Sequence, residues 1–167
     1  MSNPNPCAIR PATAADAPAL LELIRGIAAY EKLAHAVVNT EAALLKNGFG
    51  PDPYFRALLC EVPGKPDPVG FALYFFTYST FTGKPSLYLE DLFVRPEERS
   101  SGYGKALFME LVRIAGEKGC GRMEWSVLDW NRPAIDFYLR MGAKPLEEWT
   151  VYRLDETALA ALAAQPA

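Results

Sequence analysis

The sequence has few of the residues that build metal centres, disulfide frameworks or membrane spans. Its 167 residues include one histidine, His35, and three widely spaced cysteines, Cys7, Cys60 and Cys120. A lone histidine and an odd number of separated cysteines supply neither a zinc-type ligand cluster nor a disulfide framework. The apolar runs are much shorter than the ~20 residues that a membrane-spanning helix requires. We therefore expect no metal, no membrane contact, and a reducing, cytoplasmic compartment.

An excess of positive charge is also absent. Lysine and arginine total 17 against 20 acidic residues, so the formal net charge is −3. Nucleic-acid binding depends on basic patches that neutralise phosphates, and this balance therefore argues against a nucleic-acid partner. Half of the residues are hydrophobic, which is typical of a globular chain with a sizeable core. Length and composition predict a flexible leader over residues 1–7, without signal-peptide features, and a single domain over residues 8–167.

Hydrophobic periodicity predicts a mixed α/β (α+β) fold. Residues 13–16 resemble a capping box, and apolar residues at helical spacing follow it. Short, turn-like gaps separate the next three strand-like runs, which indicates an antiparallel meander. The predicted strands span residues 9–12, 54–62, 69–78, 86–95, 122–130 and 148–154, and the predicted helices span residues 14–32, 40–48, 107–119, 134–141 and 155–164.

A glycine-containing loop carries the clearest chemical pattern. It follows a predicted strand, precedes a predicted helix and has the form Arg99-x-x-Gly102-x-Gly104. Glycines permit close approach of a ligand to the backbone, and the free N–H groups at a helix start attract anions, so the loop suits a pyrophosphate. Two common nucleotide motifs are excluded, because Ala106 and Leu107 stand where those motifs require Ser/Thr and Gly. A helix entry without any ligand is the alternative interpretation of the loop alone.

Together with its neighbours, this loop resembles the GNAT superfamily of acetyl-CoA-dependent N-acetyltransferases over residues 8–154. The sequence is most similar to the branch of diamine (spermidine/spermine) and thialysine acetyltransferases. The resemblance implies a GNAT-like, mostly antiparallel sheet flanked by helices, with a splayed parallel strand pair that binds acetyl-CoA. It also implies a homodimer and a small-molecule amine as acceptor. The segments that carry it are residues 9–16, 29–31, 76–79, 87–94, 99–104, 129–131 and 137–143.

The resemblance assigns the acetyl-CoA contacts to three places. Backbone groups of one strand would bind the pantetheine arm as an added strand would. The glycine loop would wrap the pyrophosphate, and a third contact would form at the start of a short helix, where Asn131 also suits an N-cap. The strand residues are Leu92, Phe93 and Val94; the loop residues are Arg99, Ser100, Ser101, Gly102, Tyr103, Gly104 and Lys105; and the helix start comprises Asn131, Pro133 and Ala134.

Two residues are candidates for proton transfer. A phenol near the thioester sulfur can protonate the leaving thiolate, and the resemblance gives this role to Tyr138. A protonated amine cannot attack, so a base must remove its proton, and the resemblance gives this role, through water, to Glu90. Glu90 and Asp91 are adjacent in an apolar strand, with side chains expected on opposite faces. Ordinary salt bridges for these carboxylates and core packing for Tyr138 are the alternatives. Cys120 lies away from the motifs, so we expect direct attack in a ternary complex.

The acceptor pocket is expected to be acidic and short. Polyamine acetylators carry an acidic residue and a tryptophan where this chain has Ser79 and Phe81, so a short amino acid or diamine is favoured over a long polycation. A protein, peptide or antibiotic amine is the alternative acceptor, and a non-catalytic acyl-CoA-binding dimer is the alternative function. The resemblance places Tyr30, Glu31, Glu90, Glu124, Trp125, Ser126 and Glu148 around the acceptor.

Overall fold

A five-stranded sheet with the strand order β1-β2-β3-β4-β5 organises the larger of two units in the computed structural model. The units comprise residues 1–126 and 127–167, and the structure describes residues 6–165. Neighbouring strands are antiparallel except for β4 and β5, which are parallel. The mixed, mostly antiparallel sheet predicted from the sequence is therefore confirmed. The strands are β1 (Ala8–Pro11), β2 (Arg56–Glu61), β3 (Gly70–Ser79), β4 (Lys84–Val94) and β5 (Arg122–Trp125).

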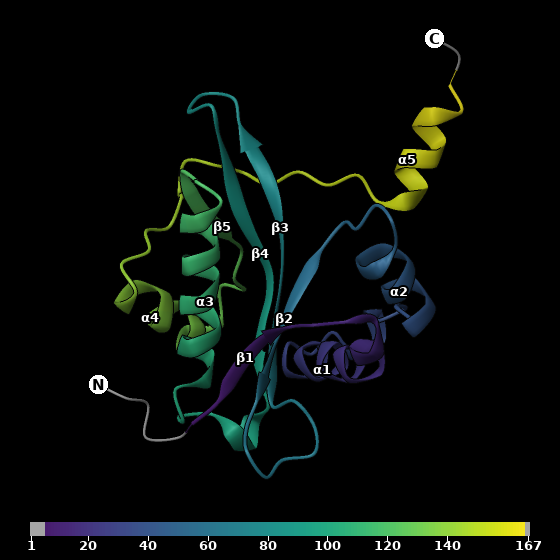
Figure 1. Cartoon of the computed structure of the whole chain (residues 1–167). Coiled ribbons are helices and arrows are strands. Elements are labelled where there is room, and N and C mark those ends of the chain that lie inside the picture. Colours follow the sequence, from purple (N-terminus) through teal and green to yellow (C-terminus); the bar gives the residue numbers. More distant parts are fainter. Residues whose placement is uncertain (1–5, 166–167) are drawn as a thin grey trace. The chain divides into compact units, whose positions relative to one another are not determined.

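Helices cover both faces of this sheet, with α1 (Ala17–Tyr30) and α2 (Glu41–Phe49) on one face and α3 (Tyr103–Glu117) on the other (Figure 1). The hydrophobic core under α1 and α2 includes Leu20 and Leu23 together with Phe71 and Phe93 of the sheet. Burying apolar side chains of this size stabilises the fold by about 1.5–3 kcal/mol for each side chain. The core fixes α1 against β3 and β4, the strands that carry the candidate site.

The helix α1 begins after the predicted capping box, and it is shorter than predicted at both ends. The Thr13 N–H donates to the Asp16 carboxylate at 2.7 Å, and a 3₁₀ turn over Ala14–Asp16 precedes α1. At the other end, Lys32 has a left-handed backbone (φ 62°), which stops the helix. The predicted helix over residues 14–32 is therefore a 3₁₀ turn, an α-helix and a turn.

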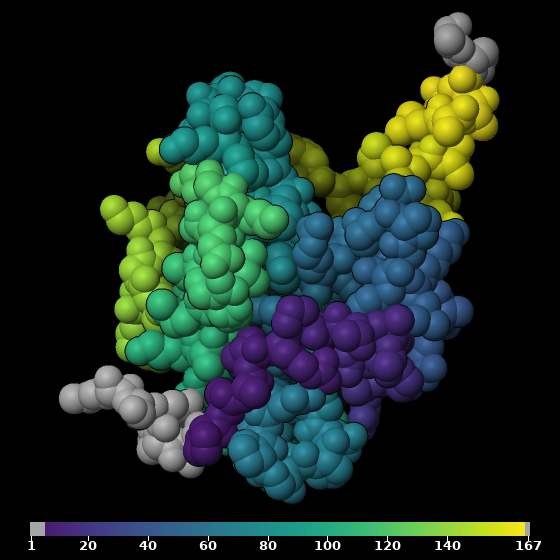
Figure 2. All heavy atoms as spheres, viewed as in Figure 1, coloured from purple at the N-terminus to yellow at the C-terminus, as the bar shows by residue number. Residues whose placement is uncertain are grey.

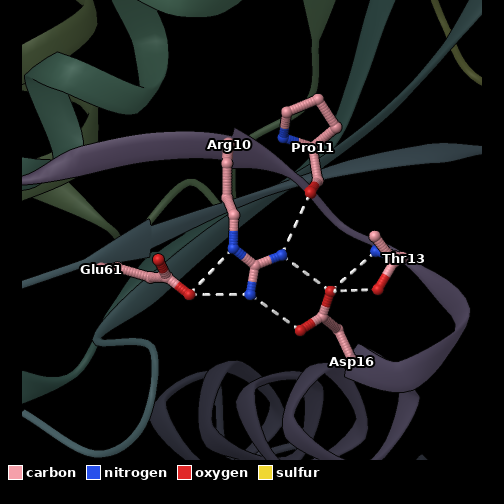
Figure 3. Close-up of polar contacts among 5 residues, drawn as sticks. All are labelled: Arg10, Pro11, Thr13, Asp16 and Glu61. Carbon is pink, nitrogen blue, oxygen red and sulfur yellow. Dashed lines mark hydrogen bonds and ion pairs between the residues drawn. The ribbon is translucent and has the colours of Figure 1, made fainter.

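A charged network ties this helix start to the edge of the sheet (Figure 3). Both terminal nitrogens of Arg10 on β1 donate to the Asp16 carboxylate at 2.8 Å, and Nε donates to Glu61 on β2 at 2.8 Å. The hydrogen bonds from Arg10 hold the pKa of Asp16 well below its usual range. Bidentate contacts between a guanidinium and a carboxylate are geometrically specific, so this network fixes where α1 begins.

The hairpin between β3 and β4 extends beyond the neighbouring α3, as Figure 2 shows at the top of the view. Its turn uses Gly83 with a positive φ of 66°, a conformation that glycine adopts without strain. Phe81 at the tip is 98% exposed, while Ser79 is buried and its hydroxyl accepts from the Thr82 N–H at 3.3 Å. The two positions that distinguish this chain from polyamine acetylators thus lie at the hairpin tip.

The second unit contains α4 (Arg132–Arg140) and α5 (Glu156–Ala163). Of the two strands predicted in this part of the chain, one is shorter than predicted and the other prediction is wrong. The predicted strand over residues 122–130 ends at Trp125, because the β4–β5 ladder ends there. The predicted strand over residues 148–154 is absent, and its apolar side chains Trp149, Val151 and Tyr152 are exposed. Alternating apolar residues become a strand only where a neighbour accepts their hydrogen bonds.

Candidate active site

The end of β4 has a backbone edge that β5 does not cover. The parallel ladder runs from the pair Ser86–Arg122 to the pair Leu89–Trp125 and stops there. On its other side, β4 stays paired with β3 as far as Val94. The predicted pantetheine-binding residues Leu92, Phe93 and Val94 occupy this splayed part, and the side chains of the last two are buried. Their backbone, rather than their side chains, is thus the group available to an extended ligand.

The glycine loop leads from this strand into α3. Gly102 precedes the helix with φ 85° and provides no side-chain cap, and Ser100 also has a positive φ of 66°. A Cβ built on Gly104 would meet only Val94 Cγ2, at an ordinary 3.8 Å. Packing within the chain therefore does not require glycine at position 104, and the space beside the first turn of α3 is open. Uncapped N–H groups and open space fit the pyrophosphate of a CoA molecule.

The side chains of the loop differ in what they can offer to a cofactor. Tyr103 is buried, which leaves its backbone N–H as its available group, whereas Ser100 and Lys105 are exposed. The half-buried Arg99 guanidinium is fixed by two contacts: its Nε donates to the Val94 carbonyl at 3.1 Å, and its carbon lies 4.2 Å from the centre of the Tyr30 ring. The structure thus joins a predicted cofactor residue to a predicted acceptor residue.

A β-bulge places the two adjacent carboxylates of β4 differently. Leu73 pairs with Asp91 and Tyr74 pairs with Leu89, so Glu90 is the additional residue of the bulge. Glu90 is exposed, whereas Asp91 is half-buried. Burial, followed by the negative charges of Glu90 and Glu31, raises the pKa of Asp91 to about 7. Burial also raises the pKa of Glu31 at the end of α1.

The sequence alone assigned no role to Asp91. In the structure, its pKa is raised more than that of any other carboxylate described beside the proposed site. The sequence did signal two adjacent acids in an apolar strand. The β-bulge determines which of the two acids is buried, and no local sequence pattern predicts this bulge. A group that titrates near neutral pH can change its charge during binding or catalysis, which makes Asp91 a further candidate.

The predicted acceptor residues of β5 lie next to the part of β4 that precedes the bulge. Tyr88 of β4 is paired with Glu124, and its hydroxyl lies 3.1 Å from the Ser126 hydroxyl. The Glu124 carboxylate forms an ion pair with the Arg122 Nε at 3.0 Å. The Trp125 ring packs edge-on against the Phe108 ring of α3. Glu124 is therefore partly neutralised, in contrast to the carboxylates around the bulge.

The remaining predicted residues lie in the second unit. Asn131 caps α4, since its side chain accepts from the Ala134 N–H at 3.4 Å, and Pro133 occupies the first turn. The Tyr138 ring on α4 packs against the Phe137 ring at 5.4 Å. Glu148 is exposed and lies in a turn. Within the described part of the chain, no cluster of three or more His, Cys, Asp or Glu side chains could hold a metal ion, and no helix is long and apolar enough to cross a bilayer.

Comparison with known proteins identifies the family. The model of the acetyltransferase (GNAT) family matches residues 23–143. A thialysine N-epsilon-acetyltransferase from Sus scrofa is 41% identical over 93% of this chain and 96% of its own length. An L-ornithine N5-acetyltransferase from Arabidopsis thaliana is 32% identical over 92% and 86%, respectively. A spermidine/spermine N(1)-acetyltransferase-like protein from Homo sapiens is 39% identical over 90% of this chain and 23% of its own length.

A solved structure supports the fold. An integron cassette protein of V. cholerae superposes with a TM-score of 0.80 over 95% of this chain and 98% of that chain, at 23% identity. The splayed β4, the uncapped glycine loop and the match to the family model agree with one another. The chain therefore belongs to the acetyltransferase (GNAT) family and is an acetyl-CoA-dependent N-acetyltransferase.

Proposed function

We propose that this enzyme acetylates the terminal primary amine of a short amino acid or diamine, by direct attack in a ternary complex. One observation carries the proposal: where β4 extends beyond β5, the half-buried carboxylate of Asp91 lies next to Glu90 in the chain and within the electrostatic range of Glu31. Such an acceptor is a cation at neutral pH, and a site with excess negative charge attracts it. The uncovered backbone of β4 continues from these carboxylates towards the glycine loop, so cofactor and amine would meet at the bulge.

The relatives support a short acceptor. Two of them are named for thialysine and ornithine, amino acids that end in a primary amine, and a third is named for its likeness to a spermidine/spermine acetyltransferase. A long polycation requires a further carboxylate at its distal ammonium. Ser79 and Phe81 offer none, because the first is buried in the hairpin turn and the second is an exposed hydrocarbon.

The reaction requires three tasks of the chain, while acetyl-CoA supplies the activated acyl group. The glycine loop and the open edge of β4 orient the thioester. Glu90 accepts a proton from the ammonium through water, which leaves a neutral amine able to form the N–C bond. Tyr138 donates its proton to the sulfur as the C–S bond breaks, and the second proton that the nitrogen loses on becoming an amide returns to the Tyr138 oxygen. Cys120 takes no part, since burial raises its pKa and keeps the thiol protonated.

The proposal includes a homodimer of this chain in the cytoplasm, as the family resemblance implies. The exposed apolar side chains of Trp149, Val151 and Tyr152 support an interface, because soluble monomers rarely expose such groups together. Size-exclusion chromatography with light scattering should give about twice the 18.4 kDa mass of the chain. A single peak at the mass of the monomer would contradict this part.

The acceptor is tested by thiol release from acetyl-CoA at pH 8, with L-thialysine, L-ornithine, putrescine, spermidine and a short lysine peptide at equal concentrations. We expect kcat/KM for one of the three short amines to exceed that for spermidine by more than about tenfold. A tenfold ratio corresponds to a difference of about 1.4 kcal/mol in the stabilisation of the transition state. A preference for spermidine would contradict the short pocket. A preference for the peptide would indicate a protein substrate, and CoA binding without any turnover would indicate a non-catalytic dimer.

A further inference from the structure

The C-terminal end of α1 contacts the glycine loop through one cation. The carbon at the centre of the Arg99 guanidinium lies 4.2 Å from the centre of the Tyr30 ring and 5.8 Å from that of Phe93 on β4. The hydrogen bond from Nε to the Val94 carbonyl fixes the same group to the strand end. Arg99 and Tyr30 are distant in the sequence, so this contact is a property of the folded protein.

Gly26, which has no side chain, allows α1 to lie close to β4. A Cβ on Gly26 of α1 would lie 2.9 Å from two atoms of the Phe93 ring, which is too close for real atoms. Glycine at this position lets α1 rest directly on Phe93. Tyr30 lies four residues later and therefore on the same face of the helix. The Gly26–Phe93 contact thus sets the height at which Tyr30 lies against Arg99.

The next residue of the chain belongs to the acidic side of the site. Glu31 follows Tyr30 directly as the C-cap of α1, and its charge acts on Asp91 at the bulge of β4. Two consecutive residues therefore act on the two halves of the site: Tyr30 contacts the cofactor loop, and the charge of Glu31 acts on Asp91 on the proposed amine side. A movement of this helix end changes both halves together.

A guanidinium can serve an aromatic ring and an anion at the same time. Its face stacks on the ring, while its edge carries N–H donors that point outward in the guanidinium plane. Within residues 6–165, the hydrogen bond of the Arg99 side chain runs from Nε to the Val94 carbonyl, while the Arg99 backbone N–H donates to the Pro96 carbonyl. The terminal nitrogens thus keep donors for a phosphate without breaking the stack on Tyr30.

We propose that Arg99 is a positioning residue for the amine site: a phosphate held by its edge fixes Tyr30, and with it Glu31, so that bound CoA strengthens amine binding. This inference rests on the proposed function, which places phosphate at the glycine loop and the amine at the carboxylates. Coupling between two sites is reciprocal, so loss of the Tyr30 ring must also weaken CoA binding. An exposed or partly desolvated cation–π contact corresponds to about three- to thirtyfold in affinity.

The first test measures CoA binding alone by titration calorimetry in a double-mutant cycle. Tyr30→Leu should raise the CoA dissociation constant about three- to thirtyfold, whereas the same change in an Arg99→Leu background should add little. Tyr30→Phe retains a ring and should restore CoA affinity to within about twofold of the native protein. Tyr54→Leu makes the same chemical change at an exposed tyrosine outside the site and controls for effects on folding. Equal effects of Tyr30→Leu in both backgrounds would overturn the proposal.

The second test measures L-thialysine binding with and without saturating CoA. In the native protein and in Tyr30→Phe, CoA should strengthen amine binding about three- to thirtyfold, and in Tyr30→Leu this dependence should vanish. Amine binding that ignores CoA in the native protein would overturn the coupling even if the cycle shows the stack. If the native protein binds CoA but neither binds nor acetylates any amine, the proposed function fails, and the CoA cycle still decides whether Arg99 and Tyr30 act together.

Discussion

The proposed cofactor side and the proposed amine side of this site are built from different groups of the protein. The cofactor side consists of backbone: the uncovered edge of β4, a left-handed Gly102 and the uncapped start of α3. The amine side consists of side chains, since Glu31, Glu90 and Asp91 come from a helix end and a β-bulge. In this proposal, backbone features hold the cofactor that the family shares, and individual side chains hold the amine, which differs among the named relatives.

The largest expected effect falls on neither side. Tyr138→Phe should lower kcat by about a hundredfold, because it removes the proposed proton donor to the thiolate without changing the shape of the site. The dissociation constant for CoA and the KM for the amine should stay within about twofold. Steady-state kinetics and calorimetry measure both, and Tyr54→Phe, at a tyrosine that is 77% exposed, is the matched control. An unchanged kcat would remove the acid role from Tyr138.

The next effect separates cofactor binding from stability. Gly104→Ala places a methyl group in the space beside the first turn of α3, which is open in the folded chain. CoA affinity should fall by more than about tenfold, while the free energy of unfolding should rise by up to about 1 kcal/mol, since alanine favours the helix over glycine. Calorimetry and urea denaturation give the two values. A loss of both affinity and stability would show that this glycine serves the fold rather than the ligand.

On the amine side, Asp91→Asn should change a pH profile. The raised pKa of Asp91, about 7, means that its carboxylate becomes charged between mildly acidic and neutral pH. In the native protein kcat/KM for the amine should therefore rise with pH through about 7, and Asp91→Asn should flatten this rise and lower kcat/KM at pH 8 by about tenfold. A profile that is identical in the variant would assign the titration to another group.

The same substitution should lower activity at pH 8 but raise the stability of the fold at that pH. Because folding raises the pKa of Asp91 above its ordinary value of 3.8, the folded state holds this proton more tightly than the unfolded state. The group therefore favours folding below about pH 4, and this contribution is lost as the pH rises to about 7. We therefore compare the free energy of unfolding of Asp91→Asn with that of the native protein, by urea denaturation at pH 4 and pH 8. The difference in favour of the variant should be larger at pH 8 than at pH 4.

The smallest effect on activity is expected for Asp16→Asn, which breaks the Arg10 network outside the site. The lowered pKa of Asp16 means that its stabilising contribution is present above about pH 4 and is lost as the pH falls below it. The variant should lose about 1–2 kcal/mol at pH 7, and kcat should stay within about twofold. Glu110→Gln, which removes an exposed ion-pair partner of Arg113 on α3, should cost no more than about 0.5 kcal/mol. Equal losses would show that the network contributes no more than a surface pair.

The contrast between the two sides also explains what the sequence could predict. The capping box at Thr13, the loop at Gly102 and the helix stop at Gly119, with its φ of 66°, depend on residues close in the chain, and each has a local pattern. The β-bulge at Glu90 depends on how β3 pairs with β4, and the position of Arg99 depends on the packing of α1. These features arise from contacts between distant segments, for which one sequence carries no periodic signal.

The wrong strand over residues 148–154 has a related cause. Apolar and polar residues alternate from Glu148 to Val151, and the side chains of Trp149 and Val151 are exposed where this pattern predicts burial on one face. Periodicity reports which side chains prefer an apolar neighbour, but it does not supply the adjacent strand. The tail helix, by contrast, needs no partner for its hydrogen bonds, and α5 forms close to the predicted bounds.

The strand order β1-β2-β3-β4-β5 has a consequence for the growing chain. Since each strand pairs with the one synthesised just before it, every new strand leaves the ribosome after its partner has been made. The sheet can therefore lengthen in the order of synthesis, once β1 has waited for α1 and α2 to be translated before its partner β2. Hairpin links make β2, β3 and β4 a rapidly formed local unit, whereas the parallel β5 requires α3 to fold across the sheet first. The uncovered edge of β4 that is proposed to receive the cofactor therefore belongs to the early unit, and the parallel β5 is among the last parts of the larger unit to form.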